Sequence, residues 1–315
     1  MTTNQFSFSR LAKLFAAGCF VVSAQQAMAN STWELGSCGR TNTATGTGTI
    51  GPTGAPGYLQ STDEGCAAGS NVGLNSVHAY AYGVNNAVAN STFGASTLMQ
   101  WGSSSGLGVQ SNGESGSPNH SVDNLGFTDM VALRFDTAVT LKQVTMGWTQ
   151  GDADFSLLAW TGVSPAPAPS ASAANVIVGR TSSQLITAPA TPASAAATGG
   201  WTVVGNYAMT GGTTTPTNTT GNDLVARVNA GNVSSSWWLV SAYNAGFAVA
   251  GGCFDGVLGG TSAACSASGT TTGANTDYFK LKSVGNRVPE PGSLALLGIG
   301  LLGAFVARRR TRLSA

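Results

Sequence analysis

Short apolar runs separated by polar stretches recur between residues 131 and 284, which is the pattern of β-strands. β-Branched and aromatic residues fill these runs, and Gly, Asn, Asp or Pro bounds them. The runs span residues 131–136, 139–148, 155–161, 201–209, 237–249 and 278–284. Between residues 30 and 307, only the last apolar run has the pattern of a helix. The pattern predicts an all-β body, a single β-sandwich or jelly roll of about 250 residues.

One break in the alternation and two insertions modify this prediction. In the run 139–148, the apolar positions change face between Leu141 and Val144, which predicts a β-bulge near Lys142. Residues 163–200 are rich in Pro, Ala and Ser, and residues 211–221 are rich in Thr. Such compositions are typical of long loops. We therefore expect residues 30–287 to form one domain.

The N-terminal 29 residues carry an apolar run of a different kind. A polar start with Arg10 and Lys13 precedes an apolar run over residues 14–22 and the small-residue triplet Ala27-Met28-Ala29. The run is too short to span a bilayer. The layout predicts a secretory signal peptide that is cleaved before Asn30.

The C-terminal 28 residues, 288–315, combine three features. A Pro-Glu-Pro box, an uncharged apolar run over residues 293–307 and an arginine cluster follow one another. The run predicts a transmembrane helix, and the arginines keep its end cytoplasmic, so that the body lies outside. The two prolines keep the box extended. The box consists of Pro289, Glu290 and Pro291, and the cluster of Arg308, Arg309 and Arg310.

Box, span and cluster together closely resemble the PEP-CTERM sorting signal of exosortase-processed bacterial proteins. The resemblance implies a Gram-negative bacterium in which the tail halts in the inner membrane. It also implies that an exosortase cuts near the box and that the body then goes to the cell surface or the exopolysaccharide matrix. The partners implied are the exosortase, the inner membrane transiently, and exopolysaccharide.

The body is similar to exosortase-dependent surface proteins of the XDP type. The similarity rests on residues 117–124, 129–136 and 147–154, with further matches at 77–82 and 237–244. The family has no activity to transfer, so this resemblance concerns sorting rather than chemistry.

Composition and charge exclude several classes of protein. Only 9% of the residues are charged, which excludes a charge-rich helical bundle or coiled coil, and the 43 glycines lack the period of collagen. Six of the 14 basic residues lie at the two ends, which leaves eight between residues 30 and 288 against 12 acidic ones. A body with a net charge of −4 is not expected to bind nucleic acid.

Export places the cysteines in an oxidising compartment. Without Cys19 in the leader, four cysteines remain and allow three disulfide pairings. We favour the local pairs, Cys38 with Cys66 and Cys253 with Cys265, because each lies in a Gly/Ser/Thr-rich stretch that a cross-link would stabilise.

Acidic residues between the strands are candidate calcium ligands. Carboxylate oxygens suit calcium, which is plentiful outside cells, so weak sites suffice there. The alternative is that these residues only close turns. The candidates are Asp123, Asp129, Asp152 and Asp154.

Two further sets of residues bear on function. Trp237 and Trp238 are adjacent, so they face opposite sides of a strand. Trp238 is therefore a candidate for stacking on sugar rings, and the alternative is that it packs in the core. Ser117, His120 and Asp123 lie within seven residues, but the stretch is typical of a turn and no nucleophile elbow is present.

These observations predict an exported surface protein with a structural or adhesive role in an exopolysaccharide or biofilm matrix. We expect no enzymatic activity and no cofactor other than calcium. A carbohydrate-binding module is the alternative, and a secreted hydrolase comes third.

Overall fold

A computed structural model of the protein describes most of the expected body. It describes residues 30–40, 57–59, 66–70, 75–84, 91–111, 114, 118–126, 128–151, 153–162, 177–186, 199–209, 223–247, 253–255, 265 and 276–287. The leader over 1–29 and the tail over 288–315 lie outside the described residues.

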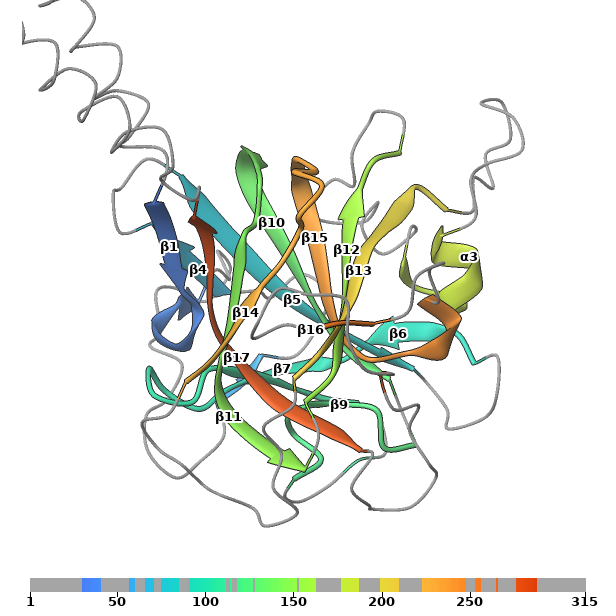
Figure 1. Cartoon of the computed structure of the whole chain (residues 1–315). Coiled ribbons are helices and arrows are strands. Elements are labelled where there is room, and N and C mark those ends of the chain that lie inside the picture. Colours follow the sequence, from blue (N-terminus) through green and yellow to red (C-terminus); the bar gives the residue numbers. More distant parts are fainter. Residues whose placement is uncertain are drawn as a thin grey trace, which may run out of the picture.

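The described residues form two β-sheets with almost no helix, which confirms the all-β prediction (Figure 1). Sheet A has eight strands, and β1 and β9 both pair with β17 beside the main path. In spatial order, sheet A runs β14 (Leu224–Arg227), β11 (Gln143–Gly151), β17 (Asp277–Arg287), β8 (Leu107–Gln110), β7 (Thr97–Gln100) and β3 (Gly57–Leu59), with β1 (Asn30–Glu34) and β9 (Val122–Asp123) alongside.

Sheet B has nine strands, and all its pairings are antiparallel except that of β13 with β16. In spatial order it runs β16 (Cys253–Asp255), β13 (Trp201–Ala208), β12 (Phe155–Trp160), β15 (Ser235–Ala242), β10 (Asp129–Val139), β5 (Ser76–Val84), β4 (Cys66–Gly69) and β2 (Gly39–Arg40), with β6 (Phe93–Ala95) beside β5. Three short helices complete the described elements: η1 (Leu35–Ser37), α3 (Ser182–Ile186) and η2 (Ala245–Phe247).

The main core lies between the two sheets. Strand β15 shows how alternation builds it, because Trp238 and Val240 point into this core and pack with Leu281 and Val284 of β17. Apolar side chains of both sheets are removed from water here, which is the principal force that holds the sheets together.

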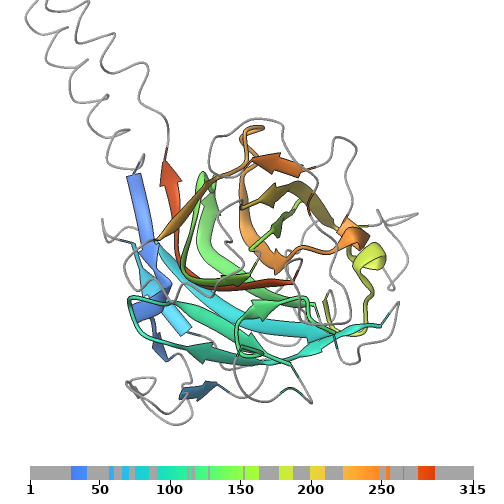
Figure 2. The same ribbon diagram turned by 60° about the horizontal axis from the view of Figure 1, so that its bottom comes forward.

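The opposite face of sheet B is also covered. Trp237 and Leu239 of β15 belong to a second cluster, together with Leu185 of α3 and Phe247 of η2. The helices α3 and η2 lie together at one side of the sheet in both views (Figures 1 and 2). The central strands of sheet B are therefore buried on both faces, and part of the predicted insertion 163–200 forms the cover.

The prediction of one strand over 139–148 with a bulge near Lys142 is wrong. Strand β10 of sheet B ends at Val139, and β11 of sheet A begins at Gln143. The change of face at Leu141 marks the point where the chain crosses between sheets. Register shifts do occur in β11, but between Thr145 and Trp148.

The two ends of the described chain pair with each other. Strand β1 runs antiparallel to β17, with Asn30 opposite Arg287. In both views the blue strand β1 lies beside the red end of β17 (Figures 1 and 2). The predicted leader and the predicted tail are therefore attached to neighbouring strand ends of the body.

Candidate functional site

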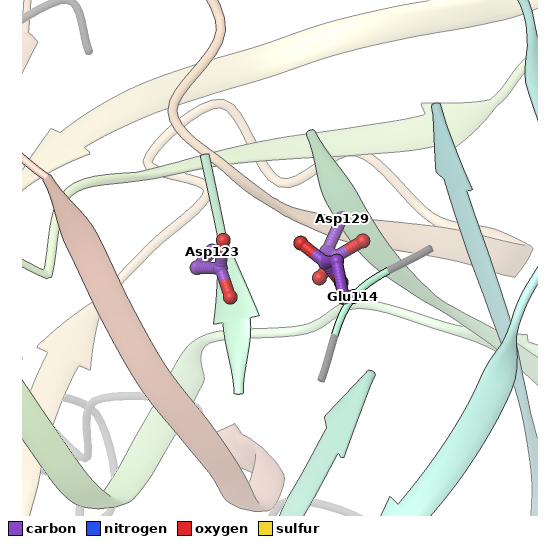
Figure 3. Close-up of side chains that lie close together, drawn as sticks. All are labelled: Glu114, Asp123 and Asp129. Atoms are coloured by element: carbon purple, nitrogen blue, oxygen red, sulfur yellow. The ribbon is translucent and has the colours of Figure 1, made fainter. Parts of the chain in front are cut away.

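Three carboxylates converge where the connection from β8 to β9 meets both sheets. Asp123 ends β9 of sheet A, Asp129 begins β10 of sheet B, and Glu114 lies in the connection. One carboxylate oxygen from each residue lies within 4.8 Å of the others (Figure 3). Both aspartates are 0% exposed, and Glu114 is half-buried. We call these three residues the acidic trio.

Few hydrogen-bond donors reach the acidic trio. Ser111 donates its backbone N–H to Glu114 Oε2 at 2.7 Å and its hydroxyl to Asp129 Oδ1 at 2.5 Å. The backbone N–H of Leu125 donates to Asp123 Oδ1 at 3.1 Å. The second oxygen of each carboxylate is buried without a hydrogen-bond partner: Glu114 Oε1, Asp123 Oδ2 and Asp129 Oδ2.

Burial and mutual repulsion disfavour the charged forms of the acidic trio. Burial raises the pKa of Asp129 and of Asp123 well above the ordinary value, and the neighbouring carboxylates raise both further. Hydrogen bonds to these aspartates, including one from the Asp123 backbone to Asp129, act in the opposite direction and are weaker. Burial also raises the pKa of Glu114 to about 7.

Tyr278 of β17 belongs to the same environment. It pairs with Asp123 in the β9–β17 register, and its hydroxyl is buried without a hydrogen-bond partner. Burial, followed by the charges of Asp123 and Glu114, raises its pKa to about 12. The phenol therefore stays neutral near the carboxylates.

Gly83 provides the space in which Asp129 and Ser111 meet. It lies opposite Asp129 in the β5–β10 register. A Cβ atom at this position would lie 1.7 Å from Ser111 Oγ and 2.6 Å from Asp129 Oδ1. Only glycine fits here without displacing the hydroxyl and the carboxylate.

The arrangement suits a hard cation. All the available ligand atoms are oxygens, which favours calcium or magnesium over zinc or copper. A divalent ion would neutralise the repulsion among the carboxylates, and otherwise they can remain buried only by holding protons.

Of the four predicted calcium ligands, two lie in the acidic trio, one lies elsewhere in the body and one lies outside the described residues. The carboxylates of Asp123 and Asp129 lie close together, whereas Asp152 is not among the described residues. Glu114 was not predicted, because it stands alone in a Gly/Ser-rich stretch without alternation. The one signal available in the sequence was that Glu114 and Asp123 lie in the same segment between two apolar runs.

Asp154 belongs to a different group, which we call the amide-bonded network. Its Oδ1 accepts the backbone N–H of Met209 at 2.9 Å, and its own N–H donates to Asp277 Oδ1 at 2.7 Å. The side-chain amide of Asn124 donates to Asp277 Oδ2 and to the carbonyl of Tyr243. Asp154 therefore holds strands together, and it lies outside the group of convergent carboxylates found among the described residues.

The prediction that Trp238 stacks on sugars is wrong. Its side chain is 0% exposed and packs between the sheets, and its indole N–H donates to the Ser235 carbonyl at 2.9 Å. Trp237 points to the other face of sheet B and is buried as well, because α3 and η2 cover that face. The other five tryptophans are buried or half-buried, and the one exposed large hydrophobic side chain in the described part of the chain is Val225.

His120 lies in an aromatic group on sheet A. Its ring stacks on Trp101 at 4.2 Å between centroids. Lys280 places its ammonium 4.1 Å from the Trp101 centroid and 4.3 Å from that of Trp148. Burial lowers the pKa of Lys280 to about 8, whereas the two indole faces favour its charged form. Ser117 lies outside the described residues, and Asp123 is in the acidic trio.

The cysteines follow the local pairing as far as they are described. Cys253 forms a disulfide with Cys265. Cys38 is also disulfide-bonded. The side chain of Cys66 lies outside the described part, so the pairing of Cys38 with Cys66 stays a prediction.

Comparison with known families identifies the tail. A family model described as the PEP-CTERM protein-sorting motif matches residues 287–310. The chain carries a PEP-CTERM motif. The matched range contains the whole Pro-Glu-Pro box and the arginine cluster, which confirms the resemblance found in the sequence. A PEP-CTERM motif marks an exported protein that is anchored transiently in the membrane and targeted by an exosortase.

Within the body, the PEP-CTERM match includes only Arg287, the last residue. Neither the curated proteins nor the solved structures contain a match to the chain. The similarity of the body to XDP-type surface proteins therefore stays a prediction. Within the described residues no helix has the length and apolar character needed to cross a membrane, and the predicted span over 293–307 lies outside them.

Proposed function

We propose that this protein is a non-catalytic structural or adhesive component of the cell surface or exopolysaccharide matrix, released by an exosortase. Residues 293–307 hold it in the inner membrane of a Gram-negative cell, and the enzyme cuts near Pro289, Glu290 and Pro291. The observation that supports export and processing by an exosortase is the PEP-CTERM match over residues 287–310.

The geometry of the body supports this order of events. The PEP-CTERM match begins at Arg287, the last residue of β17, which pairs with Asn30. The leader and the tail thus join the body at neighbouring strand ends. Before either cut, both tethers would hold that end of the body toward the membrane. After both cuts, the sandwich would leave without losing a paired strand.

The intact mass of the protein from the cell surface and from the medium tests the proposal. We expect the wild-type chain to have lost its residues beyond the box, and Glu290→Ala to keep them and to stay in the membrane fraction. Glu34→Ala is the matched control, since it removes an exposed carboxylate of the body and leaves the tail intact. Wild-type protein that retains residues beyond Pro291 in both fractions would overturn the proposal.

A further inference from the structure

We propose that Glu114, Asp123 and Asp129 bind one calcium ion that joins sheet A to sheet B. This inference goes beyond the sorting function and does not depend on cleavage of the tail. It concerns a binding site built by the body alone.

The unpartnered oxygens are the first argument. Asp123 and Asp129 are 0% exposed, and each keeps one oxygen without a hydrogen-bond partner. A buried polar atom without a partner destabilises a fold, so native proteins rarely retain one without a ligand. The third such oxygen belongs to Glu114, and all three residues present an oxygen to one shared space (Figure 3).

The spacing is the second argument. Oxygens that share one calcium ion at 2.3–2.6 Å lie at most about 5 Å apart, whereas oxygens on one magnesium ion lie at most about 4.2 Å apart. The three ligand atoms lie within 4.8 Å of one another, a limit that the calcium sphere accommodates, and the titration against magnesium below separates the two ions. Calcium takes six to eight oxygens, and water reaching half-buried Glu114 would supply further ligands.

The position of the ion gives it a structural consequence. Asp123 is on sheet A, Asp129 is on sheet B, and Glu114 belongs to the connection that leads from β8 to β9. A cation there would link the two sheets at one edge of the core. The body of an exported protein would be tightened once it reaches calcium-rich surroundings, where sites of 10⁻⁴ to 10⁻³ M affinity suffice.

The test uses the full chain, exported and purified, stripped with EDTA and titrated with CaCl₂. Calorimetry should give one ion per chain. At a calcium concentration 100 times Kd, the midpoint of thermal unfolding should rise by about 5–10 °C. Magnesium chloride at the same concentration should raise it by less than half as much.

Variants separate the site from general charge effects. Asp129→Asn should abolish the calcium shift and, in EDTA, unfold no earlier than the wild type, because the neutral amide replaces a carboxyl group whose burial disfavours its charged form. Glu114→Gln, in the half-buried connection, should weaken calcium binding at least tenfold and serves if Asp129→Asn fails to fold. Asp136→Asn removes an exposed carboxylate and should keep the full shift.

Two results would overturn the proposal. One is the lack of saturable calcium binding by the wild-type chain, which would mean that the carboxylates hold shared protons instead. The other is a calcium shift of equal size in the wild type and in Glu114→Gln.

Discussion

The molecule contains two groups of buried carboxylates that are adjacent in the sequence. Asp123 belongs to the acidic trio, and the next residue, Asn124, belongs to the amide-bonded network. In the network, Asp277 accepts the Asp154 N–H and the Asn124 amide, and Asp154 accepts the Met209 N–H. In the trio, each carboxylate keeps a buried oxygen without a partner.

This difference in hydrogen-bond partners shows how the fold stabilises buried carboxylates that have a structural role. The network surrounds its carboxylates with N–H donors from several strands, so that no cation is needed to compensate their burial. Among the described residues, Ser111 and Leu125 donate to the trio, and each carboxylate still keeps one buried oxygen without a hydrogen-bond partner. The number of N–H donors therefore distinguishes the acidic trio, our candidate ion site, from the amide-bonded network.

The largest expected effect is on the network. Asp277→Ala removes the acceptor of the Asp154 N–H and of the Asn124 amide, and it should lower the free energy of unfolding by about 3 kcal/mol. Urea denaturation measures this loss. Glu34→Ala, at an exposed position, should change the free energy by less than about 0.5 kcal/mol. A loss at Asp277 no larger than at Glu34 would remove the contrast between the two groups.

The next effect concerns the space beside the trio. Gly83→Ala places a methyl group against Ser111 Oγ and Asp129 Oδ1, so it should cost about 1–3 kcal/mol in the same urea experiment. Gly69→Ala is the matched control, because it also lies in a strand of sheet B and a Cβ there meets nothing within 4 Å. Equal stability of the two variants would mean that Ser111 and Asp129 do not need this space.

The smallest effect is a pH dependence of the calcium-free protein. The folded-state pKa of Glu114 is about 7, above its unfolded value, so the folded state holds more protons between about pH 4.5 and pH 7. Stability should therefore fall as pH rises through this window. Glu114→Gln should show a weaker fall than the wild type in urea titrations with EDTA. Parallel profiles of the two proteins would contradict the raised pKa of Glu114.

The strands were the most predictable part of the structure. Runs such as 155–161 and 201–209 correspond closely to β12 and β13, because alternation and flanking turn residues are local signals. The run 139–148 failed for a definite reason. Apolar positions on either side of residue 142 serve the same core from two different sheets, and a local pattern cannot distinguish that crossing from a bulge.

The candidate site was only half predictable. Asp123 and Asp129 were predicted as candidate oxygen ligands, but Glu114 joins them through the packing of a connection against two sheets. Asp154 shares their residue type and differs only in its surroundings. Trp238 failed for a related reason, since alternation gives two faces to a strand but does not say that both are covered.

The sequence by itself determined the β-rich body and the C-terminal sorting motif and favoured the Cys253–Cys265 pair, because each depends on residues that are close along the chain. Tertiary structure alone decided which carboxylates converge, which receive N–H donors, and that α3 and η2 cover the outer face of sheet B. Those outcomes depend on distances between strands of the two sheets and the segments packed against them. Such distances arise only when the two sheets bury their apolar faces against each other.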